Sequence, residues 1–302
     1  MCGIFSIINI NYNLLTNIDI ENSFMNGVSR GPEHSNRLKL HNCFHGFHRL
    51  AINGVNDKSN QPITIDNITL LCNGEIYNYK ELYKYIDEVP RTESDCEIII
   101  YLYKKFGIKY TLQLLNGEYA FIIIDLRDTN NSFSKYIHIA RDPFGVRPLF
   151  WFDSNNTDNT VAIASELKSL INIKNKYETS NVKQFKPGSY TTLKMSNDNF
   201  TTWNISSTEV SFYNYPICNV TSNIDLPSIY KSLSFLLNQS VCYRCDNSDR
   251  PVACLLSGGL DSSTVAAIAS NYFKKKGQTL QTFSVGLKGS EDMLHAKRVA
   301  EY

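Results

Sequence analysis

The chain has 302 residues, a length typical of about two domains. Its 30 basic and 29 acidic residues give a net charge of +1, so the composition gives no sign of a nucleic-acid or membrane-surface partner. No apolar run approaches the roughly 18 residues of a membrane helix, and the N-terminus lacks the features of a signal peptide. We therefore expect a cytoplasmic protein with no nucleic-acid or membrane partner.

The 8 cysteines are typical of a protein from a reducing compartment. Most lie in apolar segments, such as VACLL at 252–256, and free buried cysteines behave as small hydrophobes. Cys242 and Cys245 form an isolated CxxC pair. Because a zinc site needs a second pair of ligands at a suitable spacing, and the sequence offers none, we expect no metal there.

The first part of the chain is rich in predicted antiparallel strands. Helices are predicted at 19–30 and 92–107. In the second helix, Ser94 and Glu97 form a capping box, and Gly107 is a candidate C-terminal stop. Apolar and β-branched residues predict strands at 3–10, 44–52, 68–78, 118–126, 134–142, 148–152, 159–165 and 187–193.

The pattern changes near residue 200. Residues 2–200 are predicted to form the strand-rich α+β domain, and 201–224, irregular and rich in Ser, Thr and Asn, are predicted to be a linker. Residues 225–302 alternate helices with short apolar strands, an order typical of an open parallel sheet. The predicted helices cover 225–241, 262–276 and 291–302, and the strands cover 251–257 and 279–287.

The segment LLSGGLDSS (255–263) joins a predicted buried strand to a helix and is a candidate phosphate loop. Gly258 and Gly259 let the backbone approach a ligand closely, and the helix N-terminus presents unpaired N–H groups. Asp261 is a candidate Mg²⁺ ligand beside bound phosphates. From these residues alone, an ordinary strand-to-helix turn capped by serines is an equal alternative.

Cys2 directly follows the initiator methionine and is a candidate nucleophile. A free thiol with a pKa near 8.5 is only slightly ionised at neutral pH and needs a base. No Cys–His–Asp array is legible in the sequence, but an α-amino group has a pKa of about 7.7–8.0. If Met1 is removed, the thiol and its base belong to one residue. The alternative is that one of the 8 cysteines falls there by chance.

A series of short motifs runs through the chain. They are MCGIFSI (1–7), RGPEHS (30–35), FHRLAI (47–52), QPI (61–63), NGEIYN (73–78), SDCE (94–97), GEYAFIIID (117–125), RDPFGVRPLF (141–150), ASELKSL (164–170) and PGSY (187–190). In this order they resemble the class II glutamine amidotransferase domain. SGGLDSS (257–263) matches the PP-loop of the ATP pyrophosphatases. With TFSVG (282–286), the whole chain resembles the glutamine-hydrolysing asparagine synthetases of the B type.

The resemblance implies both a fold and a reaction. The fold is an Ntn-hydrolase αββα sandwich of antiparallel sheets, followed by an incomplete parallel-sheet α/β domain of the PP-loop ATP pyrophosphatases. The reaction is that of an ATP-dependent carbon–nitrogen ligase, which hydrolyses glutamine and uses the ammonia to amidate ATP-activated aspartate. The implied co-substrate is ATP with Mg²⁺, and the family often forms homodimers.

The resemblance also implies roles for matching positions. Cys2 would attack the glutamine amide, while Asn73 and the N–H of Gly74 would stabilise the oxyanion. Arg49 would hold the substrate carboxylate and Asp95 its ammonium group. Glutamine would contact Arg49, Leu50, Ala51, Ile52, Asn53, Asn73, Gly74, Glu75 and Asp95. ATP would contact Leu256, Ser257, Gly258, Gly259, Asp261, Ser262, Ser263 and Val285, with Asp261 as the metal ligand.

Taken singly, these residues have simpler explanations. An Asn73-Gly74 pair between apolar runs also fits a hairpin turn. Asp95 would stabilise the N-terminus of a helix, and Arg49 fits a surface ion pair. It is their combination with a cysteine at position 2 that favours the amidase.

The sequence departs from the family pattern in two ways. Glu33 and Asn36 stand where the family usually has Asp and Gly. The chain also stops at Tyr302, before the family's segment for aspartate and the adenylate, and the residues from Asp225 are too few for a complete doubly wound domain. We therefore expect a fragment or a naturally truncated protein. Its alternative functions are a stand-alone glutaminase and a non-catalytic regulatory relative.

Overall fold

The computed structural model describes residues 1–40, 42–127, 135–154, 158–177, 181–196, 201–214, 225–287 and 289–302. The chain divides into two compact units, Met1–Tyr215 and Pro216–Tyr302. In the described ranges, none of the helices combines the length and the apolar character needed to span a bilayer.

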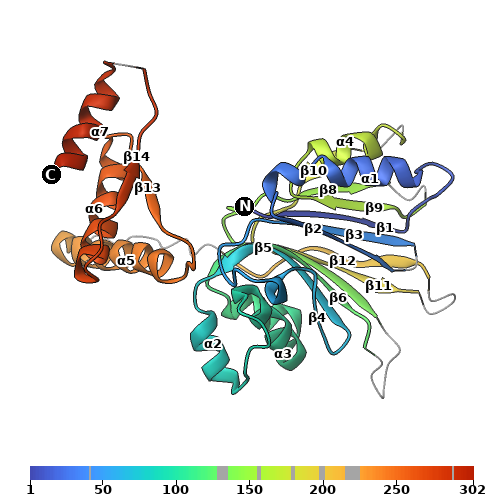
Figure 1. The fold of residues 1–302 in the computed structure, drawn as a ribbon. Helices are drawn as coiled ribbons and strands as arrows, with labels where there is room; N and C mark the ends of the chain where they lie inside the picture. Colours follow the sequence, from blue (N-terminus) through green and yellow to red (C-terminus); the bar gives the residue numbers. More distant parts are fainter. Residues whose placement is uncertain are drawn as a thin grey trace. The chain divides into compact units, whose positions relative to one another are not determined.

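Two six-stranded antiparallel sheets form the centre of the first unit (Figure 1). The first sheet consists, in spatial order, of β10 (Val182–Gln184), β8 (Phe150–Asp153), β9 (Val161–Ala164), β1 (Gly3–Ile8), β3 (Cys43–Arg49) and β2 (His34–Leu40). The second consists of β12 (Trp203–Ser211), β11 (Ser189–Met195), β7 (Tyr136–Arg141), β6 (Gly117–Asp125), β5 (Ile68–Ile76) and β4 (Ile63–Ile65).

Helices cover the outer face of each sheet, so the unit has four layers (Figure 1). α1 (Asn17–Met25) and α4 (Lys168–Lys174) pack on the first sheet, and α2 (Tyr79–Ile86) and α3 (Ile98–Leu114) pack on the second. Alternation along β1 explains this packing, because successive side chains of a strand point to opposite faces. Phe5 and Ile7 join the α1–α4 cluster, whereas Ile4 and Ile8 lie between the sheets. The predicted four-layer sandwich is confirmed.

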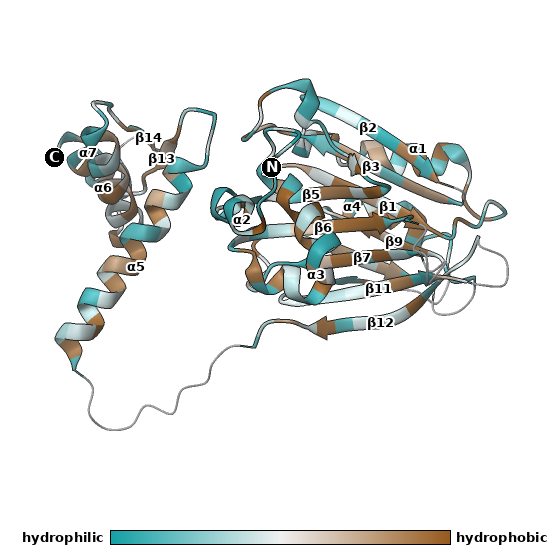
Figure 2. Cartoon of the chain, turned by 90° about the horizontal axis from the view of Figure 1, so that it is seen from below, coloured by the Kyte–Doolittle hydropathy of each residue, from teal (hydrophilic) through white to brown (hydrophobic). Residues whose placement is uncertain are grey.

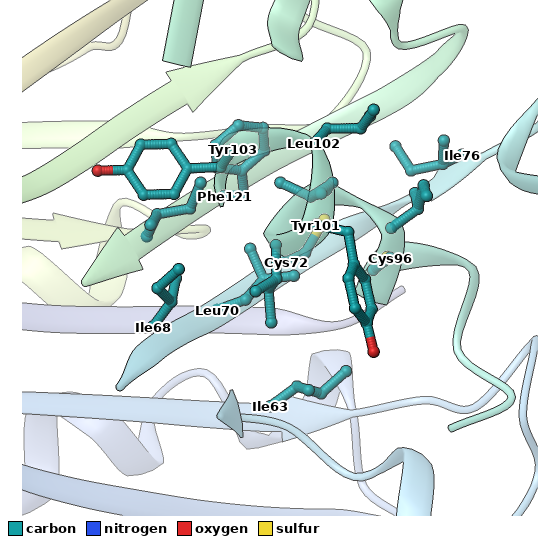
Figure 3. Close-up of a cluster of buried hydrophobic side chains, with 14 of the residues drawn as sticks. Ile63, Ile68, Leu70, Cys72, Ile76, Cys96, Tyr101, Leu102, Tyr103 and Phe121 are labelled. Atoms are coloured by element: carbon teal, nitrogen blue, oxygen red, sulfur yellow. The ribbon is translucent and has the colours of Figure 1, made fainter. Parts of the chain in front are cut away.

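A second cluster of buried side chains joins α3 to the outer face of the second sheet. Figure 3 shows Leu70 and Cys72 of β5 and Phe121 of β6 together with Leu102 and Tyr103 of α3. The apolar runs of β5 and β6 appear as brown bands in Figure 2. The apolar runs occupy the middle of these strands, Leu70–Cys72 and Tyr119–Ile124, where both faces are covered.

The structure corrects the predicted start of the linker. Trp203–Ser211 forms the edge strand β12, which pairs with β11. Trp203 is buried between the two sheets, so the hydrophobic core holds this segment on the first unit. The residues of the predicted linker from 215 to 224 lie outside the described ranges.

The region around α3 also differs from the prediction. Gly107 has φ 74° and ψ 173°, which are not helical values, so the helix that starts at Ile98 stops there, as predicted, and a second helical segment continues α3 to Leu114. Ser94 accepts the N–H of Cys96, as a cap should. Glu97 does not close the capping box, because its carboxylate accepts the N–H groups of Arg91 and Thr92.

The second unit is a small α/β arrangement. The strands β13 and β14 pair in parallel, as predicted, and α6 connects them. The parallel pairing confirms the predicted α/β class of this unit. Its elements are α5 (Leu226–Asp246), β13 (Ala253–Leu255), α6 (Leu260–Lys275), β14 (Gln281–Phe283) and α7 (Glu291–Glu301).

Candidate active site

A pocket beside the start of β1 brings the candidate residues of the first unit together. Every position predicted to contact glutamine lies in its wall, although the roles of these positions remain predictions. The lining comprises Met1, Cys2, Arg49, Leu50, Ala51, Ile52, Asn53, Ser59, Gln61, Cys72, Asn73, Gly74, Glu75, Ser94, Asp95, Cys96 and Arg147.

The Cys2 thiol is held against the chain that follows β3. Its Sγ lies 3.5 Å from the carbonyl oxygen of Leu50, to which it donates, and it accepts the N–H of Leu50 at 3.4 Å. Burial raises the pKa of the thiol, although the Leu50 contact opposes that shift. The thiol therefore needs a nearby base in order to form the reactive thiolate.

The α-amino group of the chain is close to this thiol. Burial lowers the pKa of the amino group on Met1, the charge of Cys2 opposes that change, and the Arg30 guanidinium adds to it. Arg30 Nε also donates to the carbonyl oxygen of Cys2 at 2.8 Å. This amino group belongs to Met1, and the α-amino group of Cys2 becomes free to act as a general base only when Met1 is removed.

The edge of β5 that points away from β6 faces the pocket. In an antiparallel sheet, alternate residues of a strand present both backbone groups to the same side. Tyr77 donates its N–H to Asn116 at 2.8 Å, on the β6 side. Cys72, Gly74 and Ile76 belong to the other set, so their backbone groups point away from β6.

Side chains occupy this edge on either side of Gly74. Gln61 bonds both backbone groups of Cys72, and Asp95 Oδ2 accepts the N–H of Ile76 at 2.6 Å. The N–H of Gly74 lies between these two contacts and faces the pocket. Only glycine fits here, because a Cβ would lie 2.5 Å from the carbonyl oxygen of Glu118.

Asn73 offers a second donor beside this N–H. Its side chain shares the inner face of β5 with Leu71, which packs between the sheets toward β1. Asn73 is 1% exposed, and its Nδ2 has no hydrogen-bond partner within the described ranges. Two adjacent donors that line the pocket with the Cys2 thiol are suited to a negatively charged oxygen.

Asp95 is a buried carboxylate in the same wall. Burial raises its pKa to about 6, although the hydrogen bond from the Ile76 N–H opposes the shift. The charge of Glu75 raises the pKa further, and a hydrogen bond with the Asn53 side chain lowers it. A buried carboxylate is suited to pairing with an ammonium group, which would restore the solvation that burial removes.

Arg49 is engaged by the chain between residues 53 and 60. Its Nη1 donates to the Asn56 carbonyl at 2.8 Å and to Asn60 Oδ1 at 2.7 Å, and its Nη2 donates to the Asn53 carbonyl at 3.1 Å and to the Gly54 carbonyl. Burial lowers the pKa of the guanidinium. Arg49 therefore shapes the pocket wall, and a substrate carboxylate would replace one of these loop oxygens.

The second unit brings the candidate phosphate loop to the end of β13. Gly258 has φ 83°, and a Cβ there would lie 2.5 Å from the backbone nitrogen of Ala296, so α7 approaches closely. Ser257 Oγ and Ser262 Oγ are 2.9 Å apart, and α6 starts at Leu260. The carboxylate of Asp261 stands exposed in its first turn.

The rest of the predicted ATP contacts lie near this loop. Leu256 donates its N–H to Phe283 at 2.8 Å, which brings Val285 to the neighbouring strand end. Val285 is 98% exposed, and Ser263 and Gly259 belong to the start of α6. Among the described residues, no three His, Cys, Asp or Glu side chains are grouped to hold a metal.

A family model described as "Glutamine amidotransferase domain" matches residues 1–206. The chain belongs to this family. A second model, "Asparagine synthase", matches residues 232–302.

Two relatives named "Asparagine synthetase [glutamine-hydrolyzing]" are similar to this chain over most of its length. The protein from Gallus gallus is 34% identical over 302 residues, and the one from Homo sapiens is 34% identical over 301 residues. Each alignment covers 93% of this chain and 51% of the relative. The chain thus spans about half the length of the curated relatives it matches. The resemblance inferred from the motifs is confirmed.

Solved structures share the fold of this chain. A protein described as the allosteric regulatory enzyme of purine biosynthesis matches with a TM-score of 0.53 and 20% identity, covering 96% of this chain and 68% of that one. The glutamine phosphoribosylpyrophosphate amidotransferase of B. subtilis gives 0.50 and 20%, covering 97% and 70%. At this identity the likeness concerns the fold alone.

Sequence reasoning gave no role to several residues around the pocket of the first unit. Arg147 Nη2 bonds Glu75 Oε1 at 2.9 Å, and Glu33 Oε2 accepts the N–H of Ala51 at 2.8 Å. Arg147, Glu33 and Gln61 all lie in the motifs RDPFGVRPLF, RGPEHS and QPI. Their place in these motifs could have marked the three residues as candidates, but the contacts that they make are seen only in the folded structure.

Proposed function

We propose that this chain comprises the glutaminase domain and the first part of the synthetase domain of an asparagine synthetase. The observation that carries the proposal is the pocket in which Cys2, Asn73, Gly74 and Asp95 meet. The similarity to glutamine-hydrolysing asparagine synthetases supports it. The proposed reaction converts L-aspartate, L-glutamine, ATP and water into L-asparagine, L-glutamate, AMP and diphosphate.

Glutamine hydrolysis begins, in this proposal, after removal of Met1, which makes the free α-amino group part of Cys2. The amino group takes the thiol proton, and Sγ attacks the side-chain carbonyl carbon of glutamine. The proton passes to the amide nitrogen, the C–N bond breaks, ammonia leaves, and a γ-glutamyl thioester remains. Water then gives a proton to the same amino group and attacks the thioester, which releases glutamate and restores the thiol.

Four residues hold the substrate in this scheme. Asn73 Nδ2 and the N–H of Gly74 stabilise the oxyanion, and one such donor is typically worth about 10²–10³ in rate. Asp95 pairs with the α-ammonium group, and Arg49 with the α-carboxylate. The remaining predicted contacts, Leu50, Ala51, Ile52, Asn53 and Glu75, complete the wall of the pocket.

The loop of the second unit is the proposed ATP site. The N-terminus of α6, residues 256–263 and Val285 would bind the nucleotide on which aspartate is activated as an adenylate. Asp261 supplies a single exposed carboxylate, which fits a Mg²⁺ ion that takes its other ligands from phosphates and water. The ion would neutralise phosphate charge.

The test of the glutaminase step is loss of the thiol. Cys2→Ala is expected to abolish glutamine hydrolysis, whereas Cys254→Ala, which removes a thiol of the second unit, is expected to retain it. Intact-mass spectrometry of the wild type should show that Met1 is absent. Glutaminase activity in Cys2→Ala, or an active protein that retains Met1, would rule out the mechanism.

A second assay separates a synthetase from a stand-alone glutaminase. Asparagine formation is measured with ATP, Mg²⁺ and aspartate, with glutamine or ammonium as the nitrogen source. Asparagine formation from either source would rule out a stand-alone glutaminase. We also propose a homodimer in the cytoplasm, which light scattering and cell fractionation would test.

A further inference from the structure

The side chain of Gln61 continues the hydrogen bonding of β4 toward the pocket. β4 pairs with β5 from Ile65↔Ile68 to Ile63↔Leu70 and then ends. At the next position of that edge, Gln61 Oε1 accepts the N–H of Cys72 at 2.6 Å, and its Nε2 donates to the Cys72 carbonyl at 3.0 Å. One side chain therefore makes both bonds that a strand neighbour would make.

The chemistry of this contact requires an amide. Gln61 is 5% exposed and Cys72 is 1% exposed, so water does not replace the two bonds. A primary amide offers an acceptor and a donor together, as a peptide group does. An ionised carboxylate has the acceptor alone, and a thioether of similar length has no donor and only a weak acceptor.

The position of the contact gives it a consequence for the site. Cys72 immediately precedes Asn73 and Gly74, which carry the two donors that face the pocket. On the far side of Gly74, Asp95 holds the N–H of Ile76. The stretch that carries the donors is thus fixed at both ends by side chains.

We propose that Gln61 is a positioning residue that sets the place of the oxyanion donors of Asn73 and Gly74. The inference rests on the proposed glutaminase activity. Without the contact, the stretch loses its anchor at Cys72, and a misplacement of about 1 Å can cost roughly 100-fold in rate. Because negative charge develops on the oxygen only during the reaction, the loss falls on kcat more than on KM.

The first variant removes both strong bonds. In Gln61→Met, we expect kcat for glutamine hydrolysis to fall roughly 10- to 100-fold, with KM within about threefold of the wild type. Thr64→Val is the matched control, because it removes a side-chain bond of the same strand pair, Thr64 Oγ1 to Thr69 Oγ1 at 2.9 Å. It lies outside the pocket lining, and its kcat should equal that of the wild type.

The second variant gives a measurement that would not change with pH if Gln61 had only a structural role. In Gln61→Glu, the ionised carboxylate keeps the acceptor and loses the donor, and protonation restores the donor. The kcat of Gln61→Glu, divided by the wild-type value at the same pH, should therefore rise as the pH is lowered. Should Gln61→Met fail to fold, as judged by circular dichroism, this pH profile decides the question.

Three results would overturn the inference. They are wild-type kcat in both Gln61 variants, an equal loss of kcat in Thr64→Val, and a Gln61→Glu ratio that does not change with pH. If the wild type hydrolyses glutamine, these results leave the proposed function intact. If the wild type has no glutaminase activity, the proposed function and the role of Gln61 fall together.

Discussion

The two candidate sites are built in opposite ways. The proposed glutamine pocket gathers residues from the start of β1, the chain after β3, the end of β5 and the turn at Asp95, and many of them are buried. The candidate phosphate loop is one continuous segment, 256–263, and is largely exposed. The first site therefore depends on the packing of a whole sandwich, whereas the second depends on one strand-to-helix turn.

The prediction with the largest expected effect removes one negative charge from each site and compares KM for glutamine. In Asp95→Asn, the side chain still accepts the Ile76 N–H but no longer carries the charge that pairs with the glutamine ammonium. A hydrogen bond to a charged group is worth about 1.5–3 kcal/mol, so KM for glutamine should rise roughly 10- to 150-fold. Steady-state hydrolysis of glutamine measures this.

Asp261→Asn is the matched control for this comparison. It makes the same chemical change in the phosphate loop and should leave glutamine hydrolysis unaltered. A similar rise in KM in both variants would break the separation of the two sites.

The local structure of the candidate phosphate loop was predictable because its residues are neighbours in the sequence. SGGLDSS (257–263) places two glycines, the serines and the carboxylate in one turn, and the structure keeps them there. The pattern of apolar strands also predicted an antiparallel, strand-rich first domain, whereas its division into two sheets came from the resemblance. The errors of the strand prediction were local. The segment of β12 was assigned to the linker because most of its residues are polar, and the sequence does not indicate that Trp203 is buried in the core.

The pocket was predictable only through the resemblance of its motifs. Nothing in the sequence that flanks Gln61 indicates that its side-chain amide would form hydrogen bonds with Cys72 of β5. Arg49 was expected to be available for a carboxylate, but the fold surrounds its guanidinium with loop oxygens. Contacts between distant segments depend on how the chain packs, which periodicity and propensity do not determine.

The second prediction compares one glycine from each site. In Gly74→Ala, the new Cβ would meet the Glu118 carbonyl oxygen at 2.5 Å, so the buried strand must shift, at about 1–3 kcal/mol. In Gly259→Ala, the nearest atom is Ser257 Oγ at 3.5 Å. The change there is confined to the helix cap and should cost less than about 1 kcal/mol.

Urea unfolding measures both glycine variants. Trp151 and Trp203 lie in the first unit, and they are the 2 tryptophans of the chain, so fluorescence reports the unfolding of that unit. Far-UV circular dichroism adds the helices of the second unit. Equal losses of stability in Gly74→Ala and Gly259→Ala would show that packing does not distinguish the two sites.

The last prediction concerns the pH dependence of glutamine binding, which should follow from the burial of Asp95. Burial raises the pKa of Asp95 to about 6, so the free pocket loses its negative charge as the pH falls through that value. Glutamine binds the charged form in our scheme. Its Kd should therefore rise as the pH falls below about 6, by no more than the roughly 10- to 150-fold expected for Asp95→Asn, and level off above that pH.

Calorimetry on Cys2→Ala measures this dependence without turnover, because the variant keeps the α-amino group and lacks the nucleophile. In the double variant Cys2→Ala/Asp95→Asn, binding should be weaker at every pH above about 6 and nearly independent of pH. A Kd that still rises in the double variant would assign the titration to another group, with the α-amino group as the first candidate, since it too lies in the pocket wall. The buried carboxylate would then contribute to the wall of the pocket and not to the recognition of the substrate charge.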